Sequence, residues 1–204
     1  MDEKSERRKI KTLKKIVVIG PESTGKSTLC SQLAEHYKTL WCPEYAREYL
    51  ETNGMDYTYD DLLTIAKGQI ELEEATSYKL QAASNTSQHS QLTPDSHRDH
   101  NSLLFIDTDM YVMKVWCEFA FGKCHTWILN QAAIRKYDLY LLCNVDLPWI
   151  KDNLREYPDL KTRDKLYHFY KDIMVNQSVP WVDINGSYAE RLQTAINAVD
   201  KLVK

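Results

Sequence analysis

The sequence predicts an α/β domain in which a mostly parallel, five-stranded sheet is covered by helices on both faces. Three observations support this prediction. Short apolar runs typical of strands alternate with segments of helical periodicity along the 204 residues, the order expected of parallel strands joined by helical crossovers. The stretch 14–27 has the pattern of a buried strand, a glycine-rich turn and the start of a helix. Polar residues follow several predicted strands, at the sheet edge where such domains bind ligands.

The first predicted strand, 16–19, leads into the sequence GPESTGKS, which fits the P-loop motif G-x-x-x-x-G-K-[ST]. Gly20 and Gly25 let the backbone curl so that its N–H groups point at a polyphosphate, and the next helix adds the positive end of its dipole. Lys26 would reach the β and γ phosphates, and the Ser27 hydroxyl would ligate Mg²⁺. The loop therefore predicts a P-loop NTPase that binds a nucleoside triphosphate with Mg²⁺, and the residues at the other strand ends must distinguish a kinase from a switch or a motor. The other loop positions expected to contact the nucleotide are Glu22, Ser23, Thr24 and Thr28.

The elements after the loop follow from apolar spacing and from residues that end or begin helices. Apolar residues recur at helical spacing up to Tyr37, and a short strand at 39–42 is stopped by Pro43. A second helix begins near residue 44. The sequence Thr58 to Asp61 resembles a capping box, so a third helix is expected from there to about Ala82. The polar stretch 84–101 is expected to be a surface insert.

The second half of the chain repeats the strand and helix alternation. A strong strand at 103–106 ends in Asp107-Thr108-Asp109, and the following helix is expected to stop near Gly122. Its residues Val112, Val115, Trp116 and Phe119 are spaced as a core face. The remaining predicted elements are a helix at 125–136, a strand at 138–143, an irregular segment at 145–163, a helix around 166–173, a strand at 179–184 and a final helix around 192–199.

Composition limits the classes of function. The net charge of −3 and the sequence pI of about 6.1 argue against a broad nucleic-acid surface. No apolar run is long enough to cross a bilayer, and the basic N-terminal arm at 1–13 lacks the apolar centre of a signal peptide, so a cytoplasmic protein without a membrane partner is expected. Five cysteines in predicted core elements suit reduced thiols. Residues 14–204 are expected to form a single domain, and the oligomeric state stays open.

Carboxylates at the strand ends are candidate catalytic groups. Asp107 ends the kind of strand that carries a Walker B acid, and it could hold Mg²⁺ through water or accept a proton from a hydroxyl. The alternative is that Asp107 or Asp109 caps the next helix. Glu44 and Arg47 lie one helical turn apart and could face the same cleft. There the carboxylate would hold or deprotonate a sugar hydroxyl and the arginine would steady an anion.

The irregular, charged segment 146–163 is expected to be a lid. Phosphoryl transfer needs positive charge and the exclusion of water, and Arg155 and Arg163 are the candidates to supply the charge. Ordinary surface ion pairs are the alternative for both arginines. Aromatic residues near the predicted cleft suit a flat, cationic heterocycle, although Trp116 fits the core better. They are Trp41, Tyr45, Trp116 and Trp149. No guanine-reading Asn-Lys-x-Asp sequence is present, which argues against a GTPase switch.

Blocks of sequence spread over residues 14–203 form a more specific pattern than the P-loop alone. They are GPESTGKSTL at 20–29, PEYAREYL at 43–50, IAKGQ at 65–69, DTD at 107–109, YDLYLL at 137–142, DLPW at 146–149, DNLR at 152–155 and GSYAER at 186–191. Together they resemble the nicotinamide riboside kinase domain of the NadR-type NAD-biosynthesis proteins. The resemblance covers the chain apart from the N-terminal arm and the polar insert.

The resemblance implies a P-loop NTPase fold of the nucleoside- and nucleotide-kinase type, with ATP and Mg²⁺ as cofactors. It also implies ATP-dependent phosphorylation of the ribose 5′-hydroxyl of nicotinamide riboside, which gives nicotinamide mononucleotide. It implies catalytic roles for Lys26, Asp107, Glu44 and Arg155, and Mg²⁺ bound at Ser27 and Asp107. It implies that Glu44, Tyr45, Arg47, Asp109 and Trp149 serve the substrate and that Gly186 and Arg191 border the adenine. The sequence matches neither the adenylyltransferase nor the DNA-binding domain of longer members, so their activities are not expected. A similar kinase for another nucleoside and an ATP-binding regulatory module are the alternatives.

Overall fold

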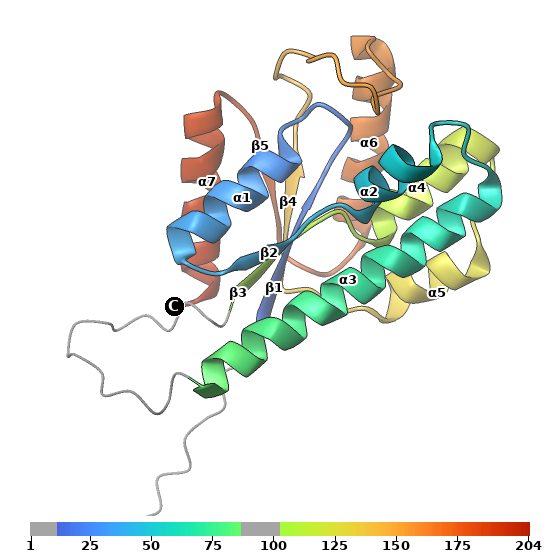
Figure 1. The fold of residues 1–204 in the computed structure, drawn as a ribbon. Coiled ribbons are helices and arrows are strands. Elements are labelled where there is room, and N and C mark those ends of the chain that lie inside the picture. The colour runs from blue at the N-terminus through green and yellow to red at the C-terminus, as the bar shows by residue number, and fades with distance from the viewer. Residues whose placement is uncertain (1–11, 87–102) are drawn as a thin grey trace, which may run out of the picture.

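Five parallel strands in the order β2-β3-β1-β4-β5 form the central sheet of the computed structural model, which describes residues 12–86 and 103–204 (Figure 1). The strands are β1 (Lys14–Ile19), β2 (Leu40–Cys42), β3 (Leu103–Asp107), β4 (Leu139–Cys143) and β5 (Trp181–Ile184). β1 lies at the centre and pairs in parallel with both β3 and β4. The predicted five-stranded parallel sheet is confirmed.

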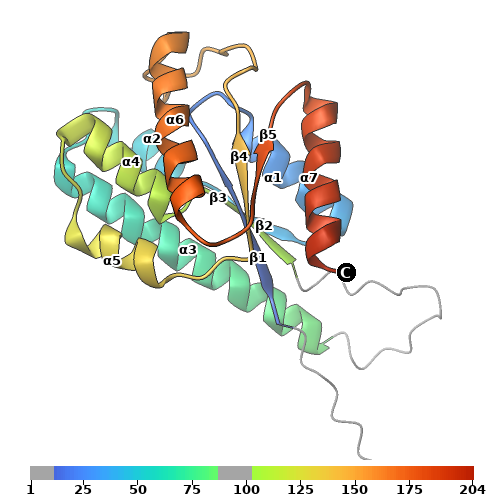
Figure 2. The ribbon, with the colours of Figure 1, turned by 180° about the vertical axis from the view of Figure 1, so that it is seen from behind.

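Helices cover both faces of this sheet, as Figures 1 and 2 show from opposite sides. The helices are α1 (Lys26–Tyr37), α2 (Tyr45–Asn53), α3 (Tyr59–Thr86), α4 (Met110–Phe121), α5 (Thr126–Ile134), α6 (Leu160–Asn176) and α7 (Tyr188–Leu202). Ile16 and Val18 of β1 pack in one core with α1 and α7, whereas Val17 and Ile19 pack in a second core with α3, α4 and α6. Because both faces of β1 are buried, its sequence is continuously apolar rather than alternating.

A third apolar cluster fixes α2 beside the sheet. It joins Ala46 of α2 to Leu62 and Ile65 of α3, Met113 of α4 and Ile128 of α5. This packing positions the residues that precede and begin α2 next to the carboxyl edge of the sheet, where β1 and β3 also end. Any ligand at that edge is therefore bounded by α2.

Two helix ends confirm their sequence signals. The Thr58 N–H donates to the Asp61 carboxylate at 2.7 Å and the Asp61 N–H donates to the Thr58 hydroxyl at 3.3 Å, which is the predicted capping box. At its C-terminal end, α4 stops at Gly122, whose φ of 68° lies in the left-handed region that glycine adopts without strain. Local residue chemistry therefore sets where both helices begin or stop.

Two predicted boundaries differ from the structure. Helix α3 continues to Thr86 instead of ending near Ala82, and most of the predicted insert and of the basic arm lies outside the described residues. Helix α6 begins at Leu160, because the Asp159 carboxylate accepts a hydrogen bond from the Thr162 N–H at 2.7 Å and caps it. The lid is therefore residues 146–159. Within 12–86 and 103–204, no helix is long and apolar enough to cross a membrane.

Candidate active site

The P-loop joins β1 to α1 at the carboxyl edge of the sheet. Gly20 has a φ of 141°, and a Cβ at this position would lie 2.6 Å from the Cys143 carbonyl oxygen, so the loop passes too close to β4 for a side chain. Gly25 has a φ of 78° and precedes the first turn of α1, which no side chain caps. The first backbone N–H groups of α1 are thus available to an anion, at the positive end of the helix. The geometry is that of a phosphate-binding loop.

Ser27 and Asp107 meet behind this loop. The Ser27 hydroxyl donates to Asp107 Oδ2 at 2.5 Å, while Asp107 Oδ1 has no hydrogen-bond partner, although the side chain is completely buried. Burial, followed by the charge of Glu44, raises the pKa of Asp107 to about 7. A buried carboxylate oxygen without a partner, next to a hydroxyl, is a ligand set that suits Mg²⁺. These two residues therefore fit the predicted metal.

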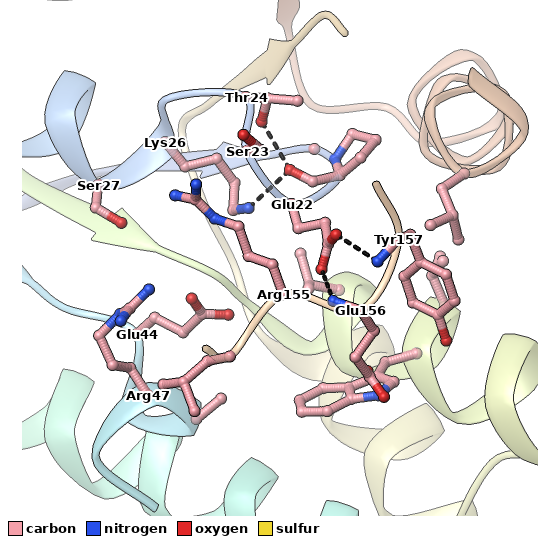
Figure 3. Close-up of a pocket in the computed structure, with 18 of the residues that line it drawn as sticks. Glu22, Ser23, Thr24, Lys26, Ser27, Glu44, Arg47, Arg155, Glu156 and Tyr157 are labelled. Atoms are coloured by element: carbon pink, nitrogen blue, oxygen red, sulfur yellow. Dashed lines mark hydrogen bonds between the residues drawn. The ribbon is translucent and has the colours of Figure 1, made fainter. Parts of the chain in front are cut away.

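A cavity of about 320 Å³ opens from the P-loop toward α4 (Figure 3). This volume is in the range of small-molecule sites. Five parts of the chain line it. They are the P-loop with the start of α1 (Gly20, Pro21, Glu22, Ser23, Thr24, Gly25, Lys26, Ser27 and Thr28), the start of α2 (Glu44, Ala46, Arg47 and Leu50), α4 (Val112, Val115, Trp116 and Phe119), the lid (Leu154, Arg155, Glu156 and Tyr157) and α6 (Leu166 and Tyr170).

Four polar residues predicted for the site meet in this cavity. Lys26 lies at the P-loop, Glu44 and Arg47 lie at the start of α2, and Arg155 reaches in from the lid (Figure 3). The Lys26 ammonium group donates to the Pro21 carbonyl at 3.0 Å, and Arg155 Nη1 donates to the Ile150 carbonyl at 2.5 Å. Both cations are thus held at the phosphate end of the cavity by backbone oxygens.

The apolar stripe of α4 serves both the core and the site. Val112 and Val115 are buried in the core as predicted, Phe119 and Trp116 pack against core clusters, and all four residues also line the cavity. Trp116 is half-buried, and its indole N–H donates to the Tyr57 hydroxyl at 2.9 Å. The face of α4 that periodicity marks as buried is therefore partly the wall of the binding site.

Three other predicted residues lie elsewhere. Asp109 is buried as the cap of α4, where its carboxylate accepts hydrogen bonds from backbone N–H groups and from the Tyr140 hydroxyl at 2.8 Å. Burial raises its pKa to about 6. The Tyr45 ring packs on Gly68 of α3, and Trp149 donates to Glu22 at 3.4 Å. None of the three is among the residues that line the cavity, and their assignment to substrate contact stays a prediction.

Two further arginines predicted from the sequence for the site, Arg163 and Arg191, are buried outside the cavity lining. Arg163 lies in the first turn of α6 rather than on the lid, and it is buried with Nε and Nη1 lacking hydrogen-bond partners. The Arg191 guanidinium group donates to the carbonyls of Thr24, Asn144 and Gly186, each at 2.9 Å, and also contacts Asp146. Arg191 therefore links the P-loop to the residues that follow β4 and precede α7. We call these contacts of Arg191 with Thr24, Asn144, Asp146 and Gly186 the Arg191 bracket.

The cavity also contains residues that the sequence did not single out. Glu156 and Tyr157 directly follow Arg155, so their place in the predicted lid was a signal for them. The other residues are Pro21, Ala46, Leu50, Leu154, Leu166 and Tyr170. Tyr170 is separated from the P-loop by most of the chain, and no local pattern distinguishes it from an ordinary core residue. Long-range packing alone brings it to the site.

The strand order, the P-loop after β1, the buried acid that ends β3 and the arginine-bearing lid together define a P-loop protein with the fold of nucleoside and nucleotide kinases. Comparison with known families gives a more specific result. The chain belongs to a P-loop family described as AAA domain (AAA_28), whose model matches residues 15–191.

Two curated proteins are similar in sequence. They are the trifunctional NAD biosynthesis/regulator protein NadR of Salmonella typhimurium strain LT2 and the protein of the same name from Escherichia coli K12. Each is 26% identical to this chain over 195 residues, and the match covers 92% of this chain and 42% of the relative. The chain thus spans less than half the length of these relatives. The resemblance to the NadR proteins inferred from the sequence is confirmed.

Solved structures show the same fold. A NadR protein in complex with NR matches with a TM-score of 0.65 at 22% identity, over 93% of this chain and 49% of that chain. A NadR protein in complex with NAD and AMP-PNP matches with a TM-score of 0.64 at 21% identity, over the same shares. Thymidylate kinase from Ehrlichia chaffeensis matches with a TM-score of 0.59 at 13% identity, over 92% of this chain and 99% of that chain. The chain therefore has the P-loop kinase fold of these structures.

Proposed function

We propose that the protein is an ATP-dependent kinase that transfers the γ-phosphate to the 5′-hydroxyl of nicotinamide riboside and so forms nicotinamide mononucleotide. The proposal depends above all on one observation, that a single cavity connects the P-loop to a wall of aromatic and acidic side chains. The similarity to NadR proteins, one of which was solved in complex with NR, supports the same substrate.

The wall that α4 and the end of the lid form suits a flat, cationic base. Trp116, Phe119 and Tyr157 supply aromatic surface, which attracts cations through the negative faces of the rings. Glu156 adds a carboxylate that accepts a hydrogen bond from the Tyr57 hydroxyl at 2.9 Å. Nicotinamide riboside carries a positive charge on its pyridinium ring, whereas the common nucleosides are neutral. The charge of this wall therefore favours nicotinamide riboside over them.

Glu44 is the general base in this proposal. It lines the cavity, and its Oε1 accepts a 3.3 Å hydrogen bond from the Thr108 hydroxyl, which holds the carboxylate near the end of β3. Asp107 is completely buried behind Ser27, so a ribose hydroxyl in the cavity has no direct access to it. Glu44 would accept the proton as the 5′-oxygen attacks phosphorus.

Lys26, Arg155 and the first N–H groups of α1 stabilise the charge on the transferring phosphoryl group. Arg47 lies next to Glu44 but forms a 2.9 Å ion pair with Asp152 of the lid, so it links α2 to the lid. Ser27 and Asp107 would hold Mg²⁺, which neutralises phosphate charge when bound. The alternative in which Asp107 is the base requires a movement of Ser27 that exposes the carboxylate.

The test is a product assay with purified protein, ATP, Mg²⁺ and nicotinamide riboside, with uridine, cytidine and deoxynucleosides run in parallel and products identified by mass. We expect the riboside to gain one phosphate with clear preference. Lys26→Ala and Glu44→Gln should keep the wild-type melting temperature and reduce kcat, the latter by about 10²–10⁴-fold, as for loss of a general base.

Other outcomes would replace the proposal. If uridine or a deoxynucleoside outcompetes nicotinamide riboside, the protein is a kinase of the same fold with a different nucleoside. If the protein binds ATP but phosphorylates no nucleoside, the regulatory alternative takes its place.

A further inference from the structure

Glu22 of the P-loop is bound to the lid rather than to the loop that carries it. Its Oε2 accepts a 2.9 Å hydrogen bond from the Glu156 N–H, and its Oε1 accepts a 2.6 Å bond from the Tyr157 N–H (Figure 3). The Trp149 indole N–H adds a longer contact of 3.4 Å to Oε1. One carboxylate therefore holds two consecutive backbone groups at the end of the lid and a side chain at its beginning.

The next P-loop residue holds the lid at a second point. Ser23, whose φ of 56° turns the loop sharply, accepts a 3.0 Å hydrogen bond from the Ile150 N–H through its hydroxyl. Between these two attachments the lid residue Asp152 pairs with Arg47 of α2. The lid is thus attached to the phosphate-binding loop near both of its ends and to α2 in between.

Arg155 is located between the two attachments. Arg155 directly precedes Glu156, whose N–H donates to Glu22. The Arg155 guanidinium group donates to the carbonyl of Ile150, and the N–H of Ile150 donates to Ser23. A shift at either attachment would therefore move the guanidinium group away from Lys26. We propose that Glu22 is a positioning residue for phosphoryl transfer, which holds the lid over the P-loop and so places Arg155 at the phosphate site.

The chemistry of the position favours this role over nucleotide contact. A carboxylate in the phosphate-binding loop repels a polyphosphate, so a direct contact with ATP would weaken binding. The same carboxylate has two oxygens for two adjacent N–H groups, and bonds to an ionised acceptor are stronger than neutral ones. The kinetic consequences rest on the phosphoryl transfer proposed above, whereas the attachment of the lid can be measured without it.

Limited proteolysis measures the attachment. Trypsin cleaves after Lys151 and Arg155, and these two sites lie inside the fastened segment. We expect Glu22→Ala to accelerate cleavage at both sites by at least about tenfold, because two charge-assisted bonds no longer oppose opening of the lid. Glu22→Gln keeps one acceptor oxygen and should give an intermediate rate. The control is Glu35→Ala, which removes an exposed glutamate on α1 and should leave the rate unchanged.

Steady-state kinetics then tests the positioning of Arg155. Glu22→Ala should lower kcat by about tenfold or more, following the loss of lid closure, with a melting temperature close to that of the wild type and partial rescue in Glu22→Gln. Unchanged tryptic cleavage of the lid in Glu22→Ala would overturn the proposal. So would a higher KM for ATP with an unchanged kcat, which is the result expected of a nucleotide contact. If no nucleoside is phosphorylated by the wild type, the kinase proposal fails, and the proteolysis still decides whether Glu22 holds the lid.

Discussion

Replacement of Arg191 by alanine distinguishes a structural bracket from a nucleotide contact. The resemblance to the NadR proteins implies that this residue borders the adenine, whereas in the structure its guanidinium group donates to the carbonyls of Thr24, Asn144 and Gly186 and contacts Asp146. The side chain of Arg191 is only 3% exposed, whereas that of Asp146 is 38% exposed. Truncation therefore leaves the carbonyls without their donors, while Asp146 regains water.

The expected loss of stability follows from these contacts. Each buried acceptor that loses its donor costs about 1–3 kcal/mol, and removing one partner of a buried ion pair costs about 3–5 kcal/mol in total. We expect Arg191→Ala to lower the free energy of unfolding by about 4 kcal/mol, toward the middle of that range because Asp146 rehydrates. For a chain of this size, such a loss lowers the melting temperature by roughly 10 °C.

Thermal and urea unfolding measure the loss of stability. The KM for ATP, measured below the melting temperature of the variant, reports nucleotide binding. Arg191→Lys keeps the charge without the planar fork and should lie between the wild type and the alanine variant. Gln193→Ala changes an exposed side chain of the same helix and serves as the control. If Arg191→Ala has the melting temperature of the wild type but a much higher KM for ATP, the structural role of Arg191 is refuted and a contact with the adenine is supported.

Three further predictions follow from the site and its surroundings. Gly68→Ala should destabilise the fold by about 1–3 kcal/mol despite the better helix propensity of alanine, because the new Cβ would lie 2.1 Å from the Tyr45 ring. Urea unfolding measures this loss, and an unchanged unfolding midpoint would contradict the close packing of Gly68 on Tyr45. Asp107 has a pKa raised to about 7, so the folded protein holds a proton there between about pH 4 and 7 while the unfolded chain has lost it, and stability falls as the pH rises through this window. Asp107→Asn should remove this decline and abolish phosphoryl transfer, and an unaltered stability profile from pH 4 to 8 would count against the burial argument. Glu156→Gln should reduce the preference for nicotinamide riboside over its neutral dihydro form by about fivefold or more, as for loss of a partly desolvated cation partner. Burial and, to a smaller extent, the charge of Glu22 raise the pKa of Glu156, and the Tyr57 hydrogen bond opposes them. As the pH is lowered, the wild type should therefore lose this preference at a higher pH than an ordinary carboxyl group would allow. If the preference is the same in Glu156→Gln as in the wild type, Glu156 does not recognise the base.

Signals that act over a few residues predicted most of the fold. The apolar run 16–19, the glycines of the P-loop, the Thr58 capping box and Gly122 each specify a local backbone conformation, and the structure has each of them. The predicted meeting of Lys26, Glu44 and Arg155 also holds, because parallel strands bring their carboxyl ends to one edge of the sheet. Errors at the ends of α3 and the lid are a few residues long, as expected where a cap competes with continued helix.

The sequence by itself determined the parallel α/β fold, the P-loop and the acids available at the strand ends, because these depend on residue types at fixed short spacings. Only the tertiary structure decided which of two neighbouring acids caps a helix and which faces Ser27, that an apolar stripe of α4 lines a cavity, and that Arg191 and Glu22 bind other parts of the chain. Apart from the local cap itself, these outcomes depend on contacts between residues far apart in the chain, such as Ser27 with Asp107, Glu22 with Tyr157 or Arg191 with Thr24. A carboxylate or guanidinium group has the same local signature whether its partner is a ligand or a backbone group, so only the packed chain identifies the partner.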